Sequence, residues 1–210
     1  MQQVLSGEKR FADPLPLMED FYTLQGEGAF QGHAAYFIRL AGCDVGCVWC
    51  DVKDSWEMDR WPLVPVKQLL ERASATPCRK VVITGGEPLM HDLGPLTAAL
   101  KRAGFQVHIE TSGAWPVSGQ LDWITFSPKK FKQPLPEIYG KADELKVVVY
   151  NKSDFGWAEQ FAEKMHPGCQ LYLQPEWSKQ QKIMPLITEY VMQHPRWQVS
   201  LQTHKFMNIP

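Results

Sequence analysis

Short apolar runs with strand character alternate with helical patterns along most of this chain. The runs are rich in β-branched and aromatic residues, which is typical of buried strands. They cover residues 36–40, 81–84, 107–111, 123–126, 147–150, 171–174 and 199–202. Between several of them, apolar residues repeat at helical spacing, within residues 66–73, 93–100, 157–165 and 183–191. Strands that alternate with helices favour right-handed βα units around a parallel sheet, so the chain is expected to have an α/β fold.

The length of the chain limits how far such a sheet can close. A complete eight-fold barrel typically takes about 250 residues, whereas this chain has 210. We therefore expect an incomplete, TIM-like βα barrel of six or seven mostly parallel strands, built from a single domain that spans residues 1–210. Residues 1–16, with Pro14 and Pro16, are expected to form a loose N-terminal arm.

The charge pattern and the start of the chain exclude some partners. The formal net charge is −1, with acidic and basic residues interspersed, whereas nucleic-acid binders usually carry a basic footprint. No apolar stretch near the start is long enough for a signal peptide or a membrane span. The expected partners therefore include neither nucleic acid nor membrane, and the expected location is the cytoplasm.

Three cysteines form the strongest chemical motif. Cys43, Cys47 and Cys50 have the spacing C-x3-C-x2-C, and Gly42 and Gly46 allow their loop to curl. Structural zinc sites and electron-transfer [4Fe–4S] clusters normally have four protein ligands. Three ligands would instead leave one iron of a [4Fe–4S] cluster open to a substrate. A zinc knuckle completed by His33 or a more distant histidine is the alternative.

The other two cysteines have a simpler interpretation. Cys78 and Cys169 each border a strand-like run, and a buried free cysteine commonly packs as a small apolar side chain. An odd number of cysteines also argues against a disulfide framework. We expect both to be structural.

Polar residues follow four of the expected strands. Their segments are 85–87 (GGE), 110–112 (ETS), 127–129 (SPK) and 174–175 (QP). In a parallel α/β sheet or barrel, ligands bind at the carboxyl ends of the strands. The pattern predicts one ligand site along one rim of the barrel.

The cysteine motif and the GGEP segment at 85–88 resemble the radical S-adenosylmethionine superfamily. The resemblance extends further, through TLQGEG at 23–28, Arg39, ETSG at 110–113, SPK at 127–129, LQP at 173–175 and LQTHK at 201–205. This ordered set resembles the 7-carboxy-7-deazaguanine synthases, the ring-contracting enzymes of deazapurine and queuosine biosynthesis. It covers nearly the whole chain after the N-terminal arm.

The resemblance implies the reaction and its components. A [4Fe–4S] cluster would cleave S-adenosylmethionine (SAM) to a 5′-deoxyadenosyl radical, which takes the C6 hydrogen of 6-carboxy-5,6,7,8-tetrahydropterin. The ring then contracts, ammonia leaves and SAM is regenerated, so the enzyme is a carbon–nitrogen lyase. Mg²⁺, a homodimer and a flavodoxin-type electron donor are also implied.

The resemblance also implies the site residues, none of which acts as a catalytic side chain. The cluster ligands would be Cys43, Cys47 and Cys50. The residues for SAM would be Gly85, Gly86, Glu87, Ser112, Ser127, Pro128, Lys129 and Gln174. The residues for the pterin would be Leu24, Gln25, Gly26, Glu27, Arg39, Thr84, Glu110, His204 and Pro210.

The chemistry of individual residues agrees with these roles. Arg39 interrupts an apolar run and can bind a carboxylate through two hydrogen bonds. Gln25, Glu27 and Glu110 supply the acceptors that pterin N–H donors require, and Glu110 has no evident partner in the sequence. His204 fits the pterin pocket and a purely structural role equally well.

One position departs from the family pattern. Two residues after the third cysteine, where the family usually has a threonine that ligates Mg²⁺, this chain has Val52. Mg²⁺ requires oxygen ligands, which a valine side chain cannot supply. Either the metal is held by the substrate, water and another oxygen, such as that of Asp51 or Asp54, or it is dispensable.

Two other functions are compatible with the cysteine motif. The first is a glycyl-radical-enzyme activase of the same superfamily, which would need an open groove for a polypeptide. The second is a non-catalytic iron–sulfur or zinc module, which would explain neither GGEP nor the polar rim.

Overall fold

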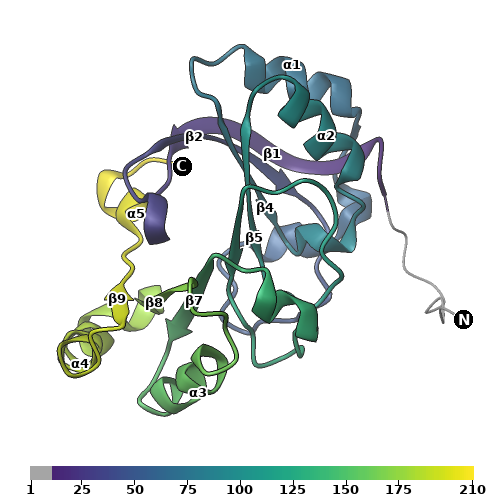
Figure 1. The fold of residues 1–210 in the computed structure, drawn as a ribbon. Coiled ribbons are helices and arrows are strands. Elements are labelled where there is room, and N and C mark those ends of the chain that lie inside the picture. Colours follow the sequence, from purple (N-terminus) through teal and green to yellow (C-terminus); the bar gives the residue numbers. More distant parts are fainter. Residues whose placement is uncertain (1–10) are drawn as a thin grey trace, which may run out of the picture.

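The computed structural model describes residues 11–210, which form one curved, nine-stranded sheet with the order β3-β1-β2-β4-β5-β6-β7-β8-β9 (Figure 1). The strands are β1 (Leu15–Leu24), β2 (Ala34–Leu40), β3 (Leu63–Val64), β4 (Lys80–Gly85), β5 (Gln106–Thr111), β6 (Trp123–Phe126), β7 (Glu144–Val149), β8 (Gln170–Pro175) and β9 (Trp197–Val199). Seven of them, β2 and β4–β9, run parallel to one another. The prediction of an incomplete, mostly parallel α/β barrel is confirmed, and β1 and β3 add two antiparallel strands that it lacked.

Four of the five α-helices in residues 11–210, α1–α4, cover the outer face of this sheet. The α-helices are α1 (Val66–Ser74), α2 (Gly94–Arg102), α3 (Ser153–Ala162), α4 (Gln180–Gln193) and α5 (Thr203–Met207). The 3-10 turns are η1 (Gly28–Phe30), η2 (Lys53–Trp56), η3 (Met58–Arg60), η4 (Pro88–Met90), η5 (Pro136–Gly140) and η6 (Trp177–Lys179). α1 packs on α2 and α2 on β5, whereas α3 and α4 pack on β7, β8 and β9. None of the helices in this part of the chain is long and apolar enough to cross a membrane.

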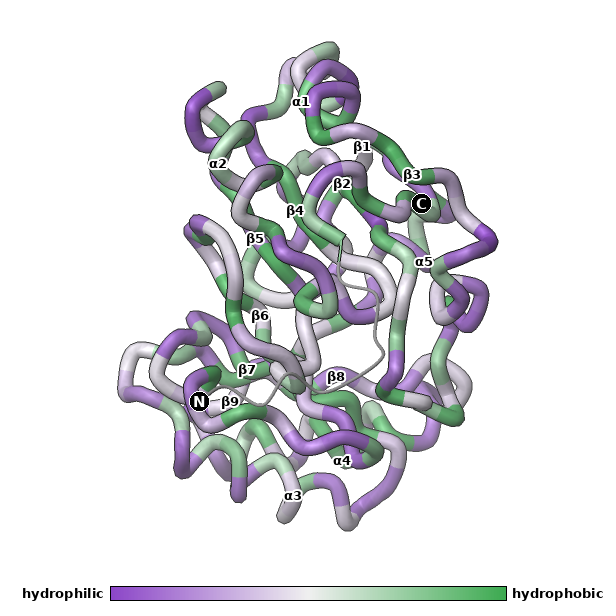
Figure 2. The backbone as a smooth tube through the Cα atoms, turned by 90° about the vertical axis from the view of Figure 1, so that its right-hand side faces the viewer, coloured by the Kyte–Doolittle hydropathy of each residue, from purple (hydrophilic) through white to green (hydrophobic). Residues whose placement is uncertain are grey.

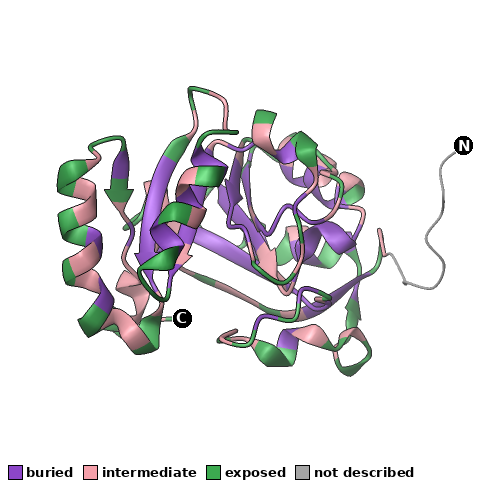
Figure 3. Cartoon of the chain, turned by 90° about the horizontal axis from the view of Figure 1, so that it is seen from below, coloured by how far each residue is buried: buried purple, intermediate pink, exposed green. Residues whose placement is uncertain are grey.

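The main core lies between the sheet and the helices. Ile83 and Ile109 of neighbouring strands are fully buried there, together with Leu69 of α1, Leu100 of α2 and Ile187 of α4. Burying each such side chain contributes about 1.5–3 kcal/mol to stability. Hydrophobic segments follow the strands in Figure 2, and Figure 3 shows the strands buried and the outward faces of the helices exposed. The helices thus fix the sheet from outside and leave its inner face for other chemistry.

The inner face of the sheet is polar. Side chains alternate between the two faces of a strand, so the residues between the core positions point inward. Among them are Lys80, His108, Glu144, Lys146 and Gln174, all buried. Polar groups in these strands therefore line the interior of the half-closed barrel instead of weakening its core.

The start of the described chain differs from expectation. Leu15 and Pro16 were expected in a loose arm but begin β1, where Leu15 is fully buried. The Pro16 carbonyl accepts a hydrogen bond from the Ala41 N–H at 2.9 Å. A proline and two acidic residues hide the strand pattern of this segment, which is stabilised by pairing with two other strands. Residues 1–10 of the expected arm lie outside the described residues.

Two strand boundaries and the end of the chain also differ. β7 begins at Glu144, not at residue 147, because Glu144 and Lys146 face the interior and break the apolar pattern. The last strand was predicted to reach Gln202, but β9 ends at Val199 and residues 203–207 form α5. The backbone N–H and the hydroxyl of Thr203 both donate to the Gly26 carbonyl, at 2.9 and 3.0 Å. α5 therefore lies across the gap between the two ends of the open sheet (Figure 1).

Candidate active site

A cavity of about 370 Å³ opens where the parallel strands end. It is lined by segments far apart in the sequence, from Phe21 of β1 to Pro210. The predicted site residues that line it are Leu24, Gln25, Gly26, Glu27, Arg39, Cys43, Cys47, Cys50, Val52, Thr84, Gly85, Gly86, Glu87, Glu110, Ser112, Ser127, Lys129, Gln174, His204 and Pro210. Pro128 does not line it. The structure thus brings nearly all of the predicted residues to one cavity.

The glycine pair at the end of β4 packs directly against the cysteine loop. The Gly86 N–H donates to the Leu40 carbonyl at 3.0 Å, and the Glu87 N–H donates to the Gly42 carbonyl at 2.8 Å. A Cβ at Gly86 would come within 2.3 Å of the Gly42 oxygen and 2.7 Å of the Cys43 Cβ. Any side chain at residue 86 would therefore push the cysteine loop out of place, which explains why glycine stands there.

The three cysteines lie along this loop beside the cavity. Burial raises the pKa of the Cys43 thiol to about 11 and also raises the pKa of Cys47. Thiols of this kind become thiolates when a metal centre binds them. Among residues 11–210, no three His, Cys, Asp or Glu side chains converge on a single ion. His33, the histidine named for a zinc knuckle, packs against the Phe30 ring and does not line the cavity with the three cysteines.

The carboxylate of Glu87 is used inside the protein. It is 1% exposed and accepts hydrogen bonds from the Thr111 hydroxyl at 2.6 Å and the Ser112 N–H at 2.8 Å. It also accepts from the Leu89 N–H at 3.1 Å and from the Ser112 hydroxyl. These bonds tie the end of β4 to the end of β5. The Glu87 carboxylate and the Ser112 hydroxyl are therefore used in contacts within the protein, although both residues line the cavity.

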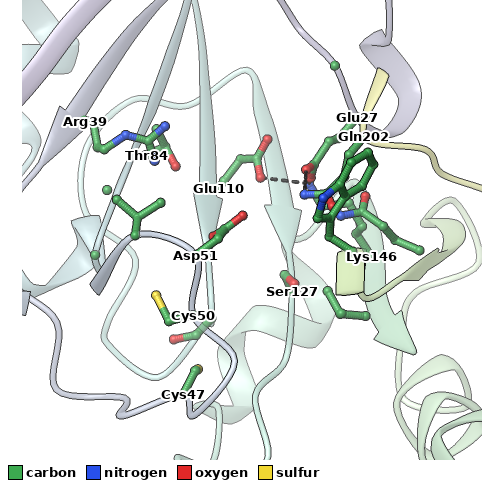
Figure 4. Close-up of a pocket in the computed structure, with 18 of the residues that line it drawn as sticks. Glu27, Arg39, Cys47, Cys50, Asp51, Thr84, Glu110, Ser127, Lys146 and Gln202 are labelled. Carbon is green, nitrogen blue, oxygen red and sulfur yellow. Dashed lines mark hydrogen bonds and ion pairs between the residues drawn. The ribbon is translucent and has the colours of Figure 1, made fainter. Parts of the chain in front are cut away.

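Two acidic residues of the cavity share one buried lysine. Lys146 Nζ on β7 lies 2.5 Å from Glu27 Oε2 and 2.8 Å from Glu110 Oε2, and its side chain is 3% exposed (Figure 4). Burial alone raises the pKa of Glu27, but the adjacent Lys146 outweighs it and lowers that pKa to about 2. Glu110, expected to have no evident partner, is thus paired, and Glu27 is not an exposed loop acid.

Amide side chains hold the same two carboxylates from the other side. Gln25 Nε2 donates to Glu110 Oε1 at 3.0 Å, and Gln202 Nε2 donates to Glu27 Oε1 at 2.9 Å. Lys146 was missed in the sequence. It interrupts the apolar segment 145–149 as Arg39 interrupts residues 36–40. A charged residue inside an apolar strand-like segment would therefore have indicated Lys146 as well.

The C-terminal segment forms the opposite wall of the cavity. His204, Lys205 and Pro210 all line it. A Cβ at Gly26 would come within 2.2 Å of the His204 ring, so the first glycine of the QGEG segment makes room for this histidine. Lys205 Nζ lies 3.2 Å from Asp51 Oδ2 and 5.0 Å from the centre of the Trp177 ring. α5 is thereby attached to the cysteine loop and to the segment after β8.

Known proteins resemble this chain over most of its length. Residues 37–143 match the family model described as Radical SAM superfamily. The chain is 55% identical to a 7-carboxy-7-deazaguanine synthase from Flavobacterium psychrophilum, over 93% of each chain, and 50% identical to one from a Synechocystis species, over 92% and 93%. It is also similar to the crystal structure of QueE from Escherichia coli, with a TM-score of 0.82, 34% identity and coverage of 89% of this chain and 93% of that one.

Proposed function

The chain belongs to the 7-carboxy-7-deazaguanine synthase family of the radical SAM superfamily, and on this premise we propose how its cavity carries out the reaction. The enzyme is a radical SAM 7-carboxy-7-deazaguanine synthase of queuosine biosynthesis. Its substrate is 6-carboxy-5,6,7,8-tetrahydropterin, which is converted to 7-carboxy-7-deazaguanine with loss of ammonia. The observation that carries the substrate assignment is the set of hydrogen-bond acceptors gathered around Lys146.

The cysteine loop fits a [4Fe–4S] cluster. Cys43, Cys47 and Cys50 would hold three of its irons, and the fourth iron would be open to a ligand. When bound, the cluster supplies the electron with which SAM is cleaved. Trp49 lines the same cavity and helps to keep water away from the loop.

SAM binds beside the cluster, at the ends of β4, β5, β6 and β8. Its polar groups meet the backbone of Gly85, Gly86 and Glu87 together with Lys129 and Gln174, all of which line the cavity. Lys129 Nζ donates to the Ser127 hydroxyl at 2.6 Å and to the Ser127 carbonyl at 2.9 Å. Ser127 thus holds the Lys129 ammonium group in a fixed position, where it can bind the SAM carboxylate.

The pterin binds between the SAM site and the C-terminal wall. Its N–H groups donate to Gln25, Glu27 and Glu110, and its carboxylate pairs with Arg39. An ionised carboxylate can only accept hydrogen bonds, so the paired glutamates select a ligand edge made of donors. Leu24, Gly26, Thr84, His204 and Pro210 complete the pterin pocket.

The side chains beside Val52 do not fit a protein-ligated Mg²⁺. Val52 offers no oxygen, and the carboxylate of Asp51 is 64% exposed and paired with Lys205. Mg²⁺ requires a near-octahedral set of oxygen ligands. We therefore assign no protein ligand to Mg²⁺, and any such ion would be held by oxygens of the substrate and of water.

Three further properties belong to the same proposal. The family resemblance supports a homodimer and a flavodoxin-type electron donor. Free thiols that must hold an iron–sulfur cluster are maintained in a reducing compartment, which supports the cytoplasm as the site of the reaction.

Cysteine variants and SAM cleavage test this assignment. Protein reconstituted with iron and sulfide without oxygen is expected to cleave SAM when reduced. Replacing Cys43, Cys47 or Cys50 with alanine should remove both iron and cleavage, whereas Cys78→Ala and Cys169→Ala are matched controls that should keep both. A non-catalytic module would cleave no SAM, and an activase would show no response to the pterin. Loss of iron in Cys78→Ala would contradict the ligand assignment.

A further inference from the structure

Lys146 joins two carboxylates that come from distant parts of the chain. Glu27 lies in the loop after β1, Glu110 lies near the end of β5, and Lys146 reaches both from β7. The Nζ distances are 2.5 and 2.8 Å, and the lysine side chain is almost inaccessible to solvent. A buried charge is costly unless it is paired and hydrogen-bonded. Removing any one of these three charges would therefore leave another without its partner.

The carboxylates are fixed on both of their oxygens. In each of them Oε2 meets Lys146, while Oε1 accepts from an amide, Gln202 for Glu27 and Gln25 for Glu110. A carboxylate oxygen can accept more than one hydrogen bond. Both groups line the cavity, so they keep acceptor capacity for a ligand while their orientation is already set.

Other charged groups around Lys146 leave it as the cation shared by these two acids. Glu144, on the same strand, has its pKa raised by burial and accepts from the Ala29 N–H at 3.1 Å and the Trp123 indole N–H at 3.3 Å. Lys129 is directed to Ser127, and burial lowers its pKa. His204 lies near Glu27, and burial lowers its pKa as well. Lys146 is the cation that is bonded to both acids.

We propose that Lys146 is a positioning residue that keeps Glu27 and Glu110 ionised together and oriented as paired acceptors for the N–H edge of the pterin. This role rests on the substrate named above. Two carboxylates in one buried site normally share a proton, because like charges disfavour each other. A shared proton would present an O–H donor to an N–H donor of the ligand. The positive charge of Lys146 offsets the repulsion between the two carboxylates. Both can therefore stay ionised without a shared proton before the ligand binds.

The proposal makes pterin affinity depend on pH in a specific way when the lysine is lost. In Lys146→Met, one of the two acids takes up a proton near neutral pH, and this proton must leave when the pterin binds. Proton release linked to binding tightens Kd about tenfold for each unit of rising pH, up to the pKa of the coupled pair. In the wild type both acids are already ionised, so they contribute no such slope.

Titration of the reconstituted holoenzyme with 6-carboxy-5,6,7,8-tetrahydropterin, in the presence of SAM and across neutral pH, tests this role. Wild type, Lys146→Met and Lys146→Gln are compared, because the glutamine variant keeps a polar group at the site if methionine prevents folding. Glu110→Gln combined with Lys146→Met is the matched control, since it removes the competing acid. Iron content and SAM affinity report on folding.

The slope of Kd against pH decides the outcome. The single variants should bind the pterin more weakly than wild type and gain affinity as pH rises, and the double variant should lose that added slope. Titration of the pterin itself is common to all the proteins and cancels in the comparison. A weakened Kd with the same slope as wild type would mean that Lys146 is only structural and would overturn its role. Wild type that binds SAM but no pterin would instead contradict the proposed function.

Discussion

Glu19 on β1 holds Arg39 on β2, with 2.6 Å between Glu19 Oε1 and Arg39 Nε. The two residues face each other in the antiparallel register of these strands. The contact is made by Nε. It fixes the orientation of the guanidinium and therefore the direction of its two terminal nitrogens. Arg39 also lines the cavity next to Thr84, its register partner on β4. The arginine is thus positioned before any carboxylate arrives.

Arg39→Ala is expected to weaken pterin binding far more than SAM binding. A charge-assisted hydrogen-bonded pair in a desolvated site contributes about 1.5–3 kcal/mol, or roughly 10–150-fold in affinity. Separate binding titrations for the two ligands measure the difference. Glu19→Gln is the matched control, because it keeps the arginine and loses only the charge that orients it, and its loss should be smaller. Equal losses for pterin and SAM in Arg39→Ala would show that the residue does not serve the substrate.

Val52 is expected to make this enzyme less dependent on Mg²⁺ than relatives with a threonine at this position. A valine side chain cannot coordinate the ion, whereas Val52→Thr restores an oxygen ligand. Rates of product formation with and without Mg²⁺ should therefore differ more in the variant than in the wild type. If wild type is inactive without Mg²⁺ and Val52→Thr changes nothing, another group holds the metal.

Pro210 is expected to form part of the pterin pocket, since the last residue of the chain lines the cavity. The segment that carries Pro210 to the cavity is anchored to Gly26 through Thr203 of α5. Extending the chain beyond Pro210 should weaken pterin binding and leave iron content and SAM binding unchanged. The same tag at the N-terminus is the control. Undiminished turnover at low pterin concentration by the C-terminally extended enzyme would exclude this role.

His108 is expected to make the protein less stable as the pH falls below about 6.5. Burial, reinforced by the nearby Lys80, lowers the pKa of His108 from 6.5 to about 4. The unfolded chain therefore takes up this proton first, and stability is lost as the pH falls from about 6.5 to 4. The loss from this residue is about 3 kcal/mol.

Denaturant unfolding of wild type and His108→Gln at a series of pH values measures this contribution. The variant should lose less stability across that interval. The contribution of Glu27 lies lower, because its folded pKa of about 2 is below the unfolded value of 4.5. Its stabilisation is present above about pH 4.5 and disappears as the pH falls toward 2, so the two effects are separable. Parallel curves for the two proteins between pH 6.5 and 4 would contradict the assignment to His108.

Local patterns in the sequence were sufficient for the parallel part of the fold and for the place of the site. The apolar residues next to Ile83 and Ile109 in the sequence are enough to predict two buried strands. The residues that follow those strands lie on one rim because parallel strands end on the same side of the sheet. β1 was missed because Pro16 and its acidic residues resemble a loop, and the segment becomes a strand by pairing with β2 and β3.

Long-range pairs could not be read from the sequence. Lys146 and Glu27 are 119 positions apart, and nothing near either residue indicates the other. α5 was missed for a similar reason: it has only five residues and is held by the contact of Thr203 with Gly26. Short elements and buried charge pairs depend on the assembled structure, whereas the strands and the cysteine motif depend on adjacent residues.

Analysis of the products shows whether this enzyme contracts the pterin ring. Reconstituted, reduced enzyme is incubated without oxygen with 6-carboxy-5,6,7,8-tetrahydropterin and an amount of SAM well below that of the pterin, and the products are identified by mass and ultraviolet absorption. We expect 7-carboxy-7-deazaguanine and ammonia in equal amounts, and more product than SAM supplied, because SAM is regenerated. Cleavage of SAM with the pterin left unchanged would contradict the account.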